Sequence, residues 1–234
     1  MKIPKKIHYC WFGRAEKSNL IKKCIASWKR YCPDYEIIEW NEENFDVSKY
    51  SYAQFCYENK KWAFLSDFVR LAVVCEHGGV YFDTDVELVK NLDDIVQYEA
   101  FYGFENENYV NTGQGFGSIP DHITGKKMME KYLELQSDEE GNFVLEACPK
   151  LNTVALIECG LKLGGVRQNV LGAEILPMEY MNPYDDPTGR LNKTENTISI
   201  HWYSKSWLSK KKILRSKLTK PFHRIFGTDC FKKH

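Results

Sequence analysis

Two carboxylates one residue apart, Asp83 and Asp85, end an apolar run in the segment GGVYFDTDVEL at residues 78–88. Because side chains alternate between the two faces of a strand, an extended segment places both carboxylates on one face and Thr84 on the other. Two like charges side by side repel, and burying either of them alone is costly. A hard divalent cation relieves both costs, since carboxylate oxygens are its preferred ligands. The segment therefore predicts a metal site, the alternative being that both acids are solvated at the end of the strand.

A second pair of charged residues precedes this segment. Asp67 and Arg70 lie three residues apart within WAFLSDFVRLAVVCE, residues 62–76, a stretch that is apolar nearly all round. Such a stretch is typical of a helix buried on most sides, and positions i and i+3 share one face of a helix. The simple interpretation is an intrahelical ion pair. Because a buried ion pair is a poor source of stability, binding of a phosphate-bearing, hydroxyl-rich ligand is the other interpretation.

A third set of polar residues lies far downstream, in ISIHWYSKSW at residues 198–207. The alternation of isoleucine with polar residues predicts a strand that ends at His201. Histidine is a common ligand of Mn²⁺-like metals, although a single histidine is more often an ordinary polar residue. The neighbouring Ser206-Trp207 pair, with lysine beside it, could hold phosphate oxygens.

Strands and helices must bring these three sets together. Apolar runs alternate with segments of helical period along the chain, which predicts an α/β fold. The predicted strands are 5–12, 35–40, 78–88, 100–104, 115–119, 174–176 and 197–202, and the predicted helices are 19–31, 52–59, 62–76, 122–135 and 149–163. Gly78 and Gly79 are expected to end the third helix, because glycine readily adopts the left-handed cap conformation. We expect one domain over residues 1–209, followed by a tail at residues 210–234.

Length and composition agree with one globular domain. The chain has 234 residues, of which 43% are hydrophobic and 27% charged, so it can bury a core and is too apolar for a disordered class. Its 8 cysteines show no C-x-x-C pair and no metal-finger spacing. The first residues lack the apolar core of a signal peptide, and no run approaches the ~18 apolar residues of a membrane span. We expect a reduced, cytoplasmic protein, either free or peripheral on the cytoplasmic face of the inner membrane.

The charge is unevenly distributed. The chain is neutral overall, yet residues 210–234 carry nine Lys or Arg against one Asp. Over residues 210–226 apolar and basic residues interleave, which predicts a peripheral contact with anionic lipid headgroups. A solvated terminus is the alternative. No other signature of nucleic-acid binding accompanies the basic tail, so we expect no nucleic-acid partner.

Taken together, these segments resemble the glycosyltransferases that carry the DXD sugar-binding motif, a family that includes the yeast initiating α-1,6-mannosyltransferase and bacterial capsule and lipopolysaccharide transferases. The likeness opens in residues 3–11, is strongest in AFLSDFVR at 63–70 and GGVYFDTD at 78–85, and ends in residues 201–207. The resemblance implies a GT-A fold, with a Rossmann-like mixed sheet flanked by helices. It also implies a metal-dependent, retaining enzyme that moves a hexose or N-acetylhexosamine from a nucleoside diphosphate sugar to a growing surface glycan such as capsule or lipopolysaccharide. A UDP-sugar is favoured as the donor, and a GDP-sugar is the alternative.

The same resemblance assigns roles to single residues. Asp83, Asp85 and His201 would hold the divalent metal, Mn²⁺ in preference to Mg²⁺, and Asp83, Asp85 and Arg70 would form the catalytic set. The nucleotide-sugar donor would contact His8, Tyr9, Trp11, Asp67, Arg70, Tyr81, Asp83, Thr84, Asn111, Ser206 and Trp207. The expected acceptor is a glycan or a lipid-linked saccharide. No nucleophilic carboxylate is assigned, so we expect a front-face path in which the leaving phosphate takes the acceptor proton.

Two other functions stay open. Phosphatases and phosphotransferases of the haloacid dehalogenase type also end an apolar strand with Asp-x-Asp and bind Mg²⁺ beside it, and Asp185 and Asp186 could supply their later acidic pair. In those enzymes the motif usually opens the chain, whereas about 80 residues precede it here, and the Ser-Asp-x-x-Arg helix would have no role. A non-catalytic module that binds carbohydrate or a membrane surface is favoured only by the aromatic residues and the basic tail.

Overall fold

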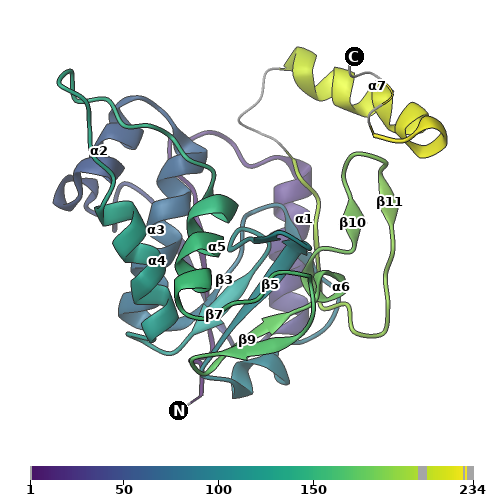
Figure 1. Ribbon diagram of the computed structural model, residues 1–234, viewed down its shortest axis with the longest axis horizontal. Coiled ribbons are helices and arrows are strands. Elements are labelled where there is room, and N and C mark those ends of the chain that lie inside the picture. Colours follow the sequence, from purple (N-terminus) through teal and green to yellow (C-terminus); the bar gives the residue numbers. More distant parts are fainter. Residues whose placement is uncertain (1, 205–209, 229, 231–234) are drawn as a thin grey trace.

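The computed structural model describes residues 2–204, 210–228 and 230 of the chain (Figure 1). The helices are α1 (Asn19–Tyr31), α2 (Ser51–Glu58), α3 (Trp62–His77), α4 (Ile123–Leu133), α5 (Cys148–Glu158), α6 (Met178–Met181) and α7 (Lys210–Phe226), with 3₁₀ turns η1 (Val47–Lys49) and η2 (Ile95–Gln97). The strands are β1 (Lys6–Cys10), β2 (Glu36–Trp40), β3 (Gly79–Tyr81), β4 (Val86–Leu88), β5 (Ala100–Asn106), β6 (Tyr109–Val110), β7 (Phe116–Ser118), β8 (Gln168–Val170), β9 (Ala173–Leu176), β10 (Tyr184–Asp185), β11 (Arg190–Leu191) and β12 (Ser199–His201).

A central mixed sheet organises the fold. Its strands follow the order β2-β1-β3-β7-β5-β9-β8, and β6 pairs with β5 beside this path. β1 runs parallel to β2 and β3, whereas β7 is antiparallel to both β3 and β5. Helices cover both faces of the sheet (Figure 1). The predicted α/β architecture, a mixed sheet flanked by helices, is therefore confirmed.

Each face of the sheet has its own hydrophobic core. Tyr81 and Tyr102 contribute to the core under α2–α5, whereas their sequence neighbours Val80 and Phe101 contribute to the opposite one. This is the period-two alternation of strand side chains. The second core includes Trp28 of α1, which is fully buried, so α1 covers the face that α2–α5 leave open (Figure 1).

The segment 78–88 is not the single strand that the sequence predicts. β3 ends at Tyr81, β4 begins at Val86, and the chain turns between them, with the N–H of Val86 donating to the carbonyl of Asp83 at 3.0 Å. Alternation along one strand is therefore the wrong reason for the directions of Asp83 and Asp85. The turn sets them instead.

The second half of this segment belongs to a different sheet. β4 pairs antiparallel with β12, and His201 lies opposite Val86 in the register. Residues more than 100 positions apart in the sequence thereby become neighbours. The pairing places the end of β12 beside Asp85, whose carbonyl accepts a hydrogen bond from the N–H of Trp202 at 3.0 Å.

Most predicted elements are observed with ends shifted by a few residues. The predicted helix 19–31 is α1 with the same ends, and the predicted strand 100–104 is the start of β5. The short elements β6, β8, β10, β11 and α6 have too few residues to show a period, so the sequence did not reveal them. In the part of the chain that the structure describes, no helix has the length and apolar character that crossing a bilayer requires.

His8 of β1 is held inside the fold by both of its ring nitrogens. Nε2–H donates to the carbonyl of Gly78 at 2.8 Å, and Nδ1 accepts from the indole N–H of Trp40 at 3.0 Å. The side chain is fully buried, and burial lowers the pKa of His8 to about 4. The neutral ring thus ties β1 to the end of α3 and to β2.

We predict that protonation of His8 costs the protein stability in mild acid. The unfolded chain binds this proton near pH 6.5 and the folded chain only near pH 4, so the contribution of His8 is complete above 6.5 and falls as the pH drops toward 4. Between pH 7 and pH 5 the wild type should lose about 2 kcal/mol more unfolding free energy than His8→Gln. Urea unfolding at both pH values measures this difference.

The core variant Val80→Ala is the control, because it destabilises the neighbouring strand without removing a titrating group. It should lower the unfolding free energy by the same amount at pH 7 and at pH 5. If His8→Gln retains the full pH dependence of the wild type, His8 is not neutral in the folded protein.

Candidate functional site

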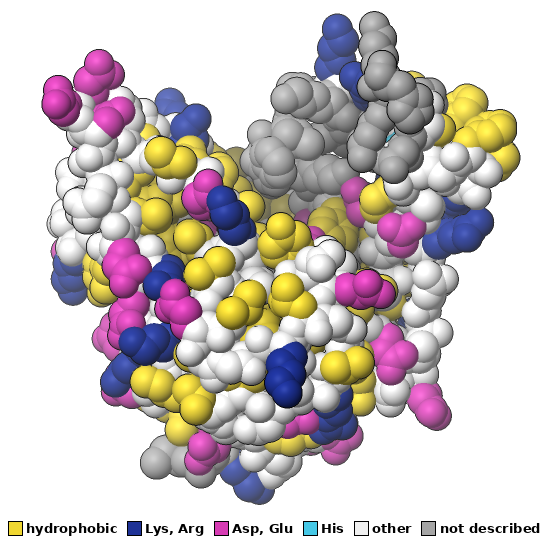
Figure 2. Space-filling model, in the orientation of Figure 1, with side chains coloured by type: hydrophobic (Ala, Val, Ile, Leu, Met, Phe, Trp, Pro, Cys, Tyr) yellow, Lys and Arg dark blue, Asp and Glu magenta, His cyan; other side chains and the backbone are white. Residues whose placement is uncertain are grey.

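A cavity of about 860 Å³ lies beyond the carboxyl ends of β1 and β3. It is bounded by the beginning of α3, the residues before α5 and the segment after β12. Figure 2 shows the surface hollowed beside the helices on the left. The predicted site residues that line the cavity are Trp11, Asp67, Arg70, Tyr81, Asp83, Thr84, Asp85, Asn111 and His201.

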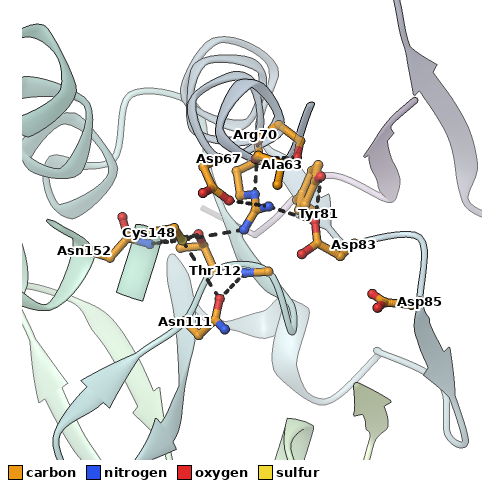
Figure 3. A network of polar contacts seen from close by, with 12 residues as sticks. Ala63, Asp67, Arg70, Tyr81, Asp83, Asp85, Asn111, Thr112, Cys148 and Asn152 are labelled. Atoms are coloured by element: carbon orange, nitrogen blue, oxygen red, sulfur yellow. Dashed lines mark hydrogen bonds and ion pairs between the residues drawn. The ribbon is translucent and has the colours of Figure 1, made fainter. Parts of the chain in front are cut away.

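Arg70 lies at the centre of the polar contacts in this cavity (Figure 3). Its Nη2 contacts Asp67 Oδ1 and Asp83 Oδ1, each at 2.8 Å. Its Nε donates to the carbonyl of Ser66 at 3.1 Å, one turn earlier in α3. The side chain is only 3% exposed, so the guanidinium is a fixed, desolvated cation shared by two carboxylates.

Tyr81 completes the support of Asp83. Its hydroxyl donates to Asp83 Oδ1 at 3.0 Å, and the Arg70 guanidinium lies 5.0 Å from the centre of its ring. One carboxylate oxygen of Asp83 is thus held by Arg70 and Tyr81. Oδ2 has no hydrogen bond or ion pair with another described residue, which leaves it as the oxygen of Asp83 that can bind a ligand.

A second group of residues, which the sequence analysis did not identify, supports Arg70 from the opposite side. Cys148 Sγ lies 3.6 Å from Arg70 Nη1, 3.2 Å from the hydroxyl of Thr112 and 3.1 Å from Nδ2 of Asn152. Burial raises the pKa of Cys148 to about 12, so the thiol stays protonated. Only the position of Cys148 at the beginning of a predicted helix could have hinted at a role. Its neighbours are supplied by the tertiary structure.

Gly113 allows the loop after β6 to approach these charges. A Cβ at this position would lie 2.4 Å from Asp83 Oδ2 and 2.9 Å from Arg70 Nη1. The Gly113 carbonyl accepts from the N–H of Asp83 at 3.0 Å, and its own N–H donates to Asn111 Oδ1 at 2.7 Å. The absence of a side chain here is what lets Asn111 and Asp83 border the same cavity.

Asp85 is held by the strand on the other side of the cavity. Its Oδ1 lies 3.3 Å from His201 Nε2, and its Oδ2 accepts from the N–H of Ser204 at 2.6 Å. Burial alone would raise the pKa of Asp85, but His201 and the Ser204 N–H hold it well below its ordinary value. Although burial favours the neutral ring, the Asp85 carboxylate raises the pKa of His201.

Tyr203 is a further residue whose position the sequence did not reveal. Its ring stacks on His201 with a centroid distance of 4.1 Å, and its hydroxyl donates to Glu105 Oε1 at 3.1 Å. The backbone of Tyr203 has a left-handed φ of 49°, which is costly for a residue with a bulky side chain. This conformation turns the chain so that the next N–H, that of Ser204, reaches Asp85.

The donor atoms present suit a divalent cation. Asp83, Asp85 and His201 each offer one ligand atom, and these atoms lie within 4.8 Å of one another. Nδ1 of His201 is buried without a hydrogen-bond partner among the described residues. Carboxylate oxygens with one imidazole nitrogen are ligands that Mn²⁺ and similar metals accept. The predicted ligands are thus brought together in the fold.

The balance of charge in the cavity also favours binding of a cation. Burial raises the pKa of Asp83 despite the nearby Arg70, and Asp85 adds to the effect. Burial also raises the pKa of Asp67 to about 7, again against Arg70. One arginine therefore does not fully compensate the clustered carboxylates, and an added cation would favour their charged forms.

Two of the predicted donor contacts, His8 and Tyr9, do not line the cavity, and two others lie outside the described residues. His8 does not line it, because both of its ring nitrogens are used inside the fold. Tyr9 does not line it either, because it packs on Trp28 and its hydroxyl donates to Glu39. Ser206 and Trp207 lie outside the described residues.

The acidic pair required by the phosphatase alternative is also placed elsewhere. Asp185 is the last residue of β10, and Asp186 follows it in the β10–β11 hairpin. Asp186 contacts Lys220 of α7 at 3.1 Å, and neither acid lines the cavity. A phosphatase of this type needs its later acidic pair beside the Asp-x-Asp carboxylates. The positions of Asp185 and Asp186 therefore argue against this function.

Comparison with known proteins confirms the resemblance predicted from the sequence. Residues 18–102 match the family model described as "Glycosyltransferase sugar-binding region containing DXD motif". Inositol phosphoceramide mannosyltransferase 3 of Schizosaccharomyces pombe is 30% identical over 107 residues, which are 42% of this chain and 29% of that protein. The chain therefore matches less than a third of the length of this relative.

A solved structure with a similar fold is also a glycosyltransferase. PaToxG glycosyltransferase superposes with a TM-score of 0.53 and 17% identity over 67% of this chain and 70% of its own. A glycosyltransferase involved in the glycosylation of the major capsid of PBCV-1 gives a TM-score of 0.48 and 11% identity over 92% and 98% of the two chains. The likeness to PaToxG concerns the fold alone, and it confirms the predicted GT-A type.

We predict that Arg70→Leu lowers the unfolding free energy by about 3–5 kcal/mol, because it leaves the partly buried carboxylates of Asp67 and Asp83 without their cation. Arg70→Leu combined with Asp67→Asn should recover part of this loss, since one uncompensated carboxylate is then removed. Urea unfolding of the single and double variants measures both effects.

The control is Arg167→Leu. Arg167 pairs with Glu174 and is 47% exposed, so its loss should cost at most about 1 kcal/mol. An Arg70→Leu protein as stable as this control would show that Arg70 does not hold the carboxylates.

Proposed function

We propose that this chain, which carries the DXD sugar-binding region of glycosyltransferases over residues 18–102, transfers a hexose or N-acetylhexosamine from a nucleoside diphosphate sugar. The observation that carries the proposal is the convergence of Asp83, Asp85 and His201 with Arg70 on one cavity. A UDP-sugar is favoured over a GDP-sugar. The family and the fold support the reaction class, and the sugar and the nucleotide are part of the proposal.

The cavity residues divide into a part for the leaving diphosphate and a part for the sugar. Asp83 Oδ2, Asp85 and His201 would hold the divalent cation, Mn²⁺ in preference to Mg²⁺. That ion would stabilise the negative charge that develops on the departing diphosphate. Asp85 is suited to this position because its low pKa keeps it ionised at neutral pH.

Asp67, Arg70 and Asn111 form the opposite wall. The Oδ1 of Asp67 is engaged by Arg70, which leaves its second oxygen to accept from a sugar hydroxyl. Arg70 fixes this orientation by holding Asp67 and Asp83 at once. The aromatic ring of Trp11, which follows β1 on the cavity wall, would provide a surface on which a base or sugar ring can stack.

We propose retention of the anomeric configuration by a front-face path. Each of the three carboxylates singled out at the cavity already has a partner, Asp67 and Asp83 with Arg70 and Asp85 with His201. The remaining oxygens of Asp67 and Asp83 are assigned to a sugar hydroxyl and to the metal. With no carboxylate assigned as nucleophile, the departing phosphate would take the proton from the acceptor hydroxyl.

The acceptor belongs to the same proposal. We expect a glycan or a lipid-linked saccharide of a surface polymer such as capsule or lipopolysaccharide, modified on the cytoplasmic face of the inner membrane. The basic tail at residues 210–226 is the proposed contact with that membrane.

The proposal predicts that Asp85→Asn abolishes Mn²⁺-dependent binding of UDP or GDP and lowers donor hydrolysis by at least about a hundredfold. The amide keeps the size of the side chain but removes its charge. Calorimetric titration of the nucleoside diphosphate with and without Mn²⁺, and hydrolysis of a panel of UDP- and GDP-sugars, measure the two effects.

Asp94→Asn, which changes an exposed acid outside the cavity, is the matched control and should behave as the wild type. A variant Asp85→Asn that binds and hydrolyses donor as the wild type does would contradict the site. Nucleotide binding that needs no metal, together with no hydrolysis of any donor, would favour the non-catalytic binding module.

A further inference from the structure

The helix α7 exposes its apolar face and docks its polar face. Leu214, Leu218 and Ile225 are 58%, 64% and 74% exposed, and their spacing of four and seven residues puts them on one side of the helix. Phe226 at the end of the helix is 68% exposed. Figure 2 shows hydrophobic side chains at the outer end of α7, at the upper right.

The opposite side of α7 contacts the β10–β11 hairpin through polar groups. Lys220 Nζ donates to the hydroxyl of Tyr184 at 2.7 Å and contacts Asp186 at 3.1 Å. Arg224 donates to the carbonyls of Thr188 and Gly189 at 2.5 and 2.9 Å. A helix that packs on a soluble domain normally does the reverse and buries its apolar side.

The charge of α7 indicates what covers the exposed face. The helix contains seven Lys or Arg and no acidic residue. Lys211 and Arg215 are exposed, and the 100° step of a helix places both on the side of Leu214 and Leu218. Apolar side chains flanked by basic ones match the boundary between acyl chains and anionic headgroups, because long basic side chains reach the phosphates while the apolar ones insert.

We propose that α7 binds an anionic bilayer surface while docked on the hairpin, with Leu214, Leu218, Ile225 and Phe226 inserted among the lipid headgroups. The contacts of Lys220 and Arg224 with the β10–β11 hairpin lie on the other side of the helix. Binding of α7 to a bilayer therefore does not require it to separate from the hairpin. The cavity is thereby held at a fixed position relative to the membrane. This inference refines the membrane contact of the proposed function and does not depend on sugar transfer.

The test is co-sedimentation of the full chain with phosphatidylcholine vesicles that contain about one third phosphatidylglycerol, at about 0.1 M salt. The wild type should bind these vesicles and bind pure phosphatidylcholine far more weakly. The variant Leu218→Glu/Ile225→Glu should lower the partition constant by about tenfold or more, because it removes two inserting side chains and adds repulsion. Raising the salt to about 0.5 M should weaken binding of the wild type.

The matched control is Val144→Glu/Val166→Glu, which makes the same charge change at two exposed valines, 71% and 62% accessible, outside α7. It should bind vesicles as the wild type does apart from a small effect of net charge. Circular dichroism and donor hydrolysis without vesicles, unchanged in both variants, show that they are folded and keep the result separate from the catalytic proposal.

Three outcomes would overturn the inference. Equal vesicle binding by the wild type and Leu218→Glu/Ile225→Glu would exclude insertion of this face. Equal binding to neutral and anionic vesicles would exclude the headgroup contact. Absent vesicle binding, together with a concentration-dependent dimer that the α7 variant abolishes, would assign the exposed face to a second copy of the chain.

Discussion

The buried guanidinium of Arg70 is the interaction on which the rest of the site depends. It contacts Asp67 and Asp83 at 2.8 Å each, and a buried carboxylate without such a partner is driven toward its neutral form. Holding a cation there requires a helix that is apolar on its other sides and a loop that comes close without a side chain, which Gly113 supplies. The contacts that stabilise this region are therefore the same ones that orient the carboxylates of the proposed site.

The half of the site that is proposed to hold a metal is divided between two sheets. Asp83 follows β3 of the central sheet, whereas Asp85 precedes β4 and is held by His201 and Ser204 from the β12 side. The turn between β3 and β4 therefore connects the central sheet to the β4–β12 sheet. Asp83 lies on the β3 side of this turn, and Asp85 lies on the β4 side. The left-handed backbone of Tyr203 directs the N–H of the next residue, Ser204, toward the Asp85 carboxylate. Such strain is typical of sites whose geometry is set by the surrounding structure.

Local patterns predicted the regular parts of the fold well. The helix 19–31 has a clear 3.6-residue period, and its ends in the structure are those that the sequence indicates. The prediction of one strand over residues 78–88 was wrong, because two short strands that follow each other closely in the sequence have the same local pattern as one long strand. Only the partners distinguish them, β1 and β7 for the first and β12 for the second. The hydrogen-bond partners of a strand lie in distant parts of the chain and leave little trace in its own sequence.

The sequence by itself determined the residue types and the local spacings of the site: Asp67 with Arg70 one turn apart on an apolar helix, and the carboxylates of the DXD turn. These features follow from covalent order and helix geometry, which need no partner. The tertiary structure alone decided that His201 meets Asp85 and that Cys148 meets Arg70. Each of those contacts joins segments separated by more than 70 residues, and it forms only where strand pairing and core packing bring the segments together.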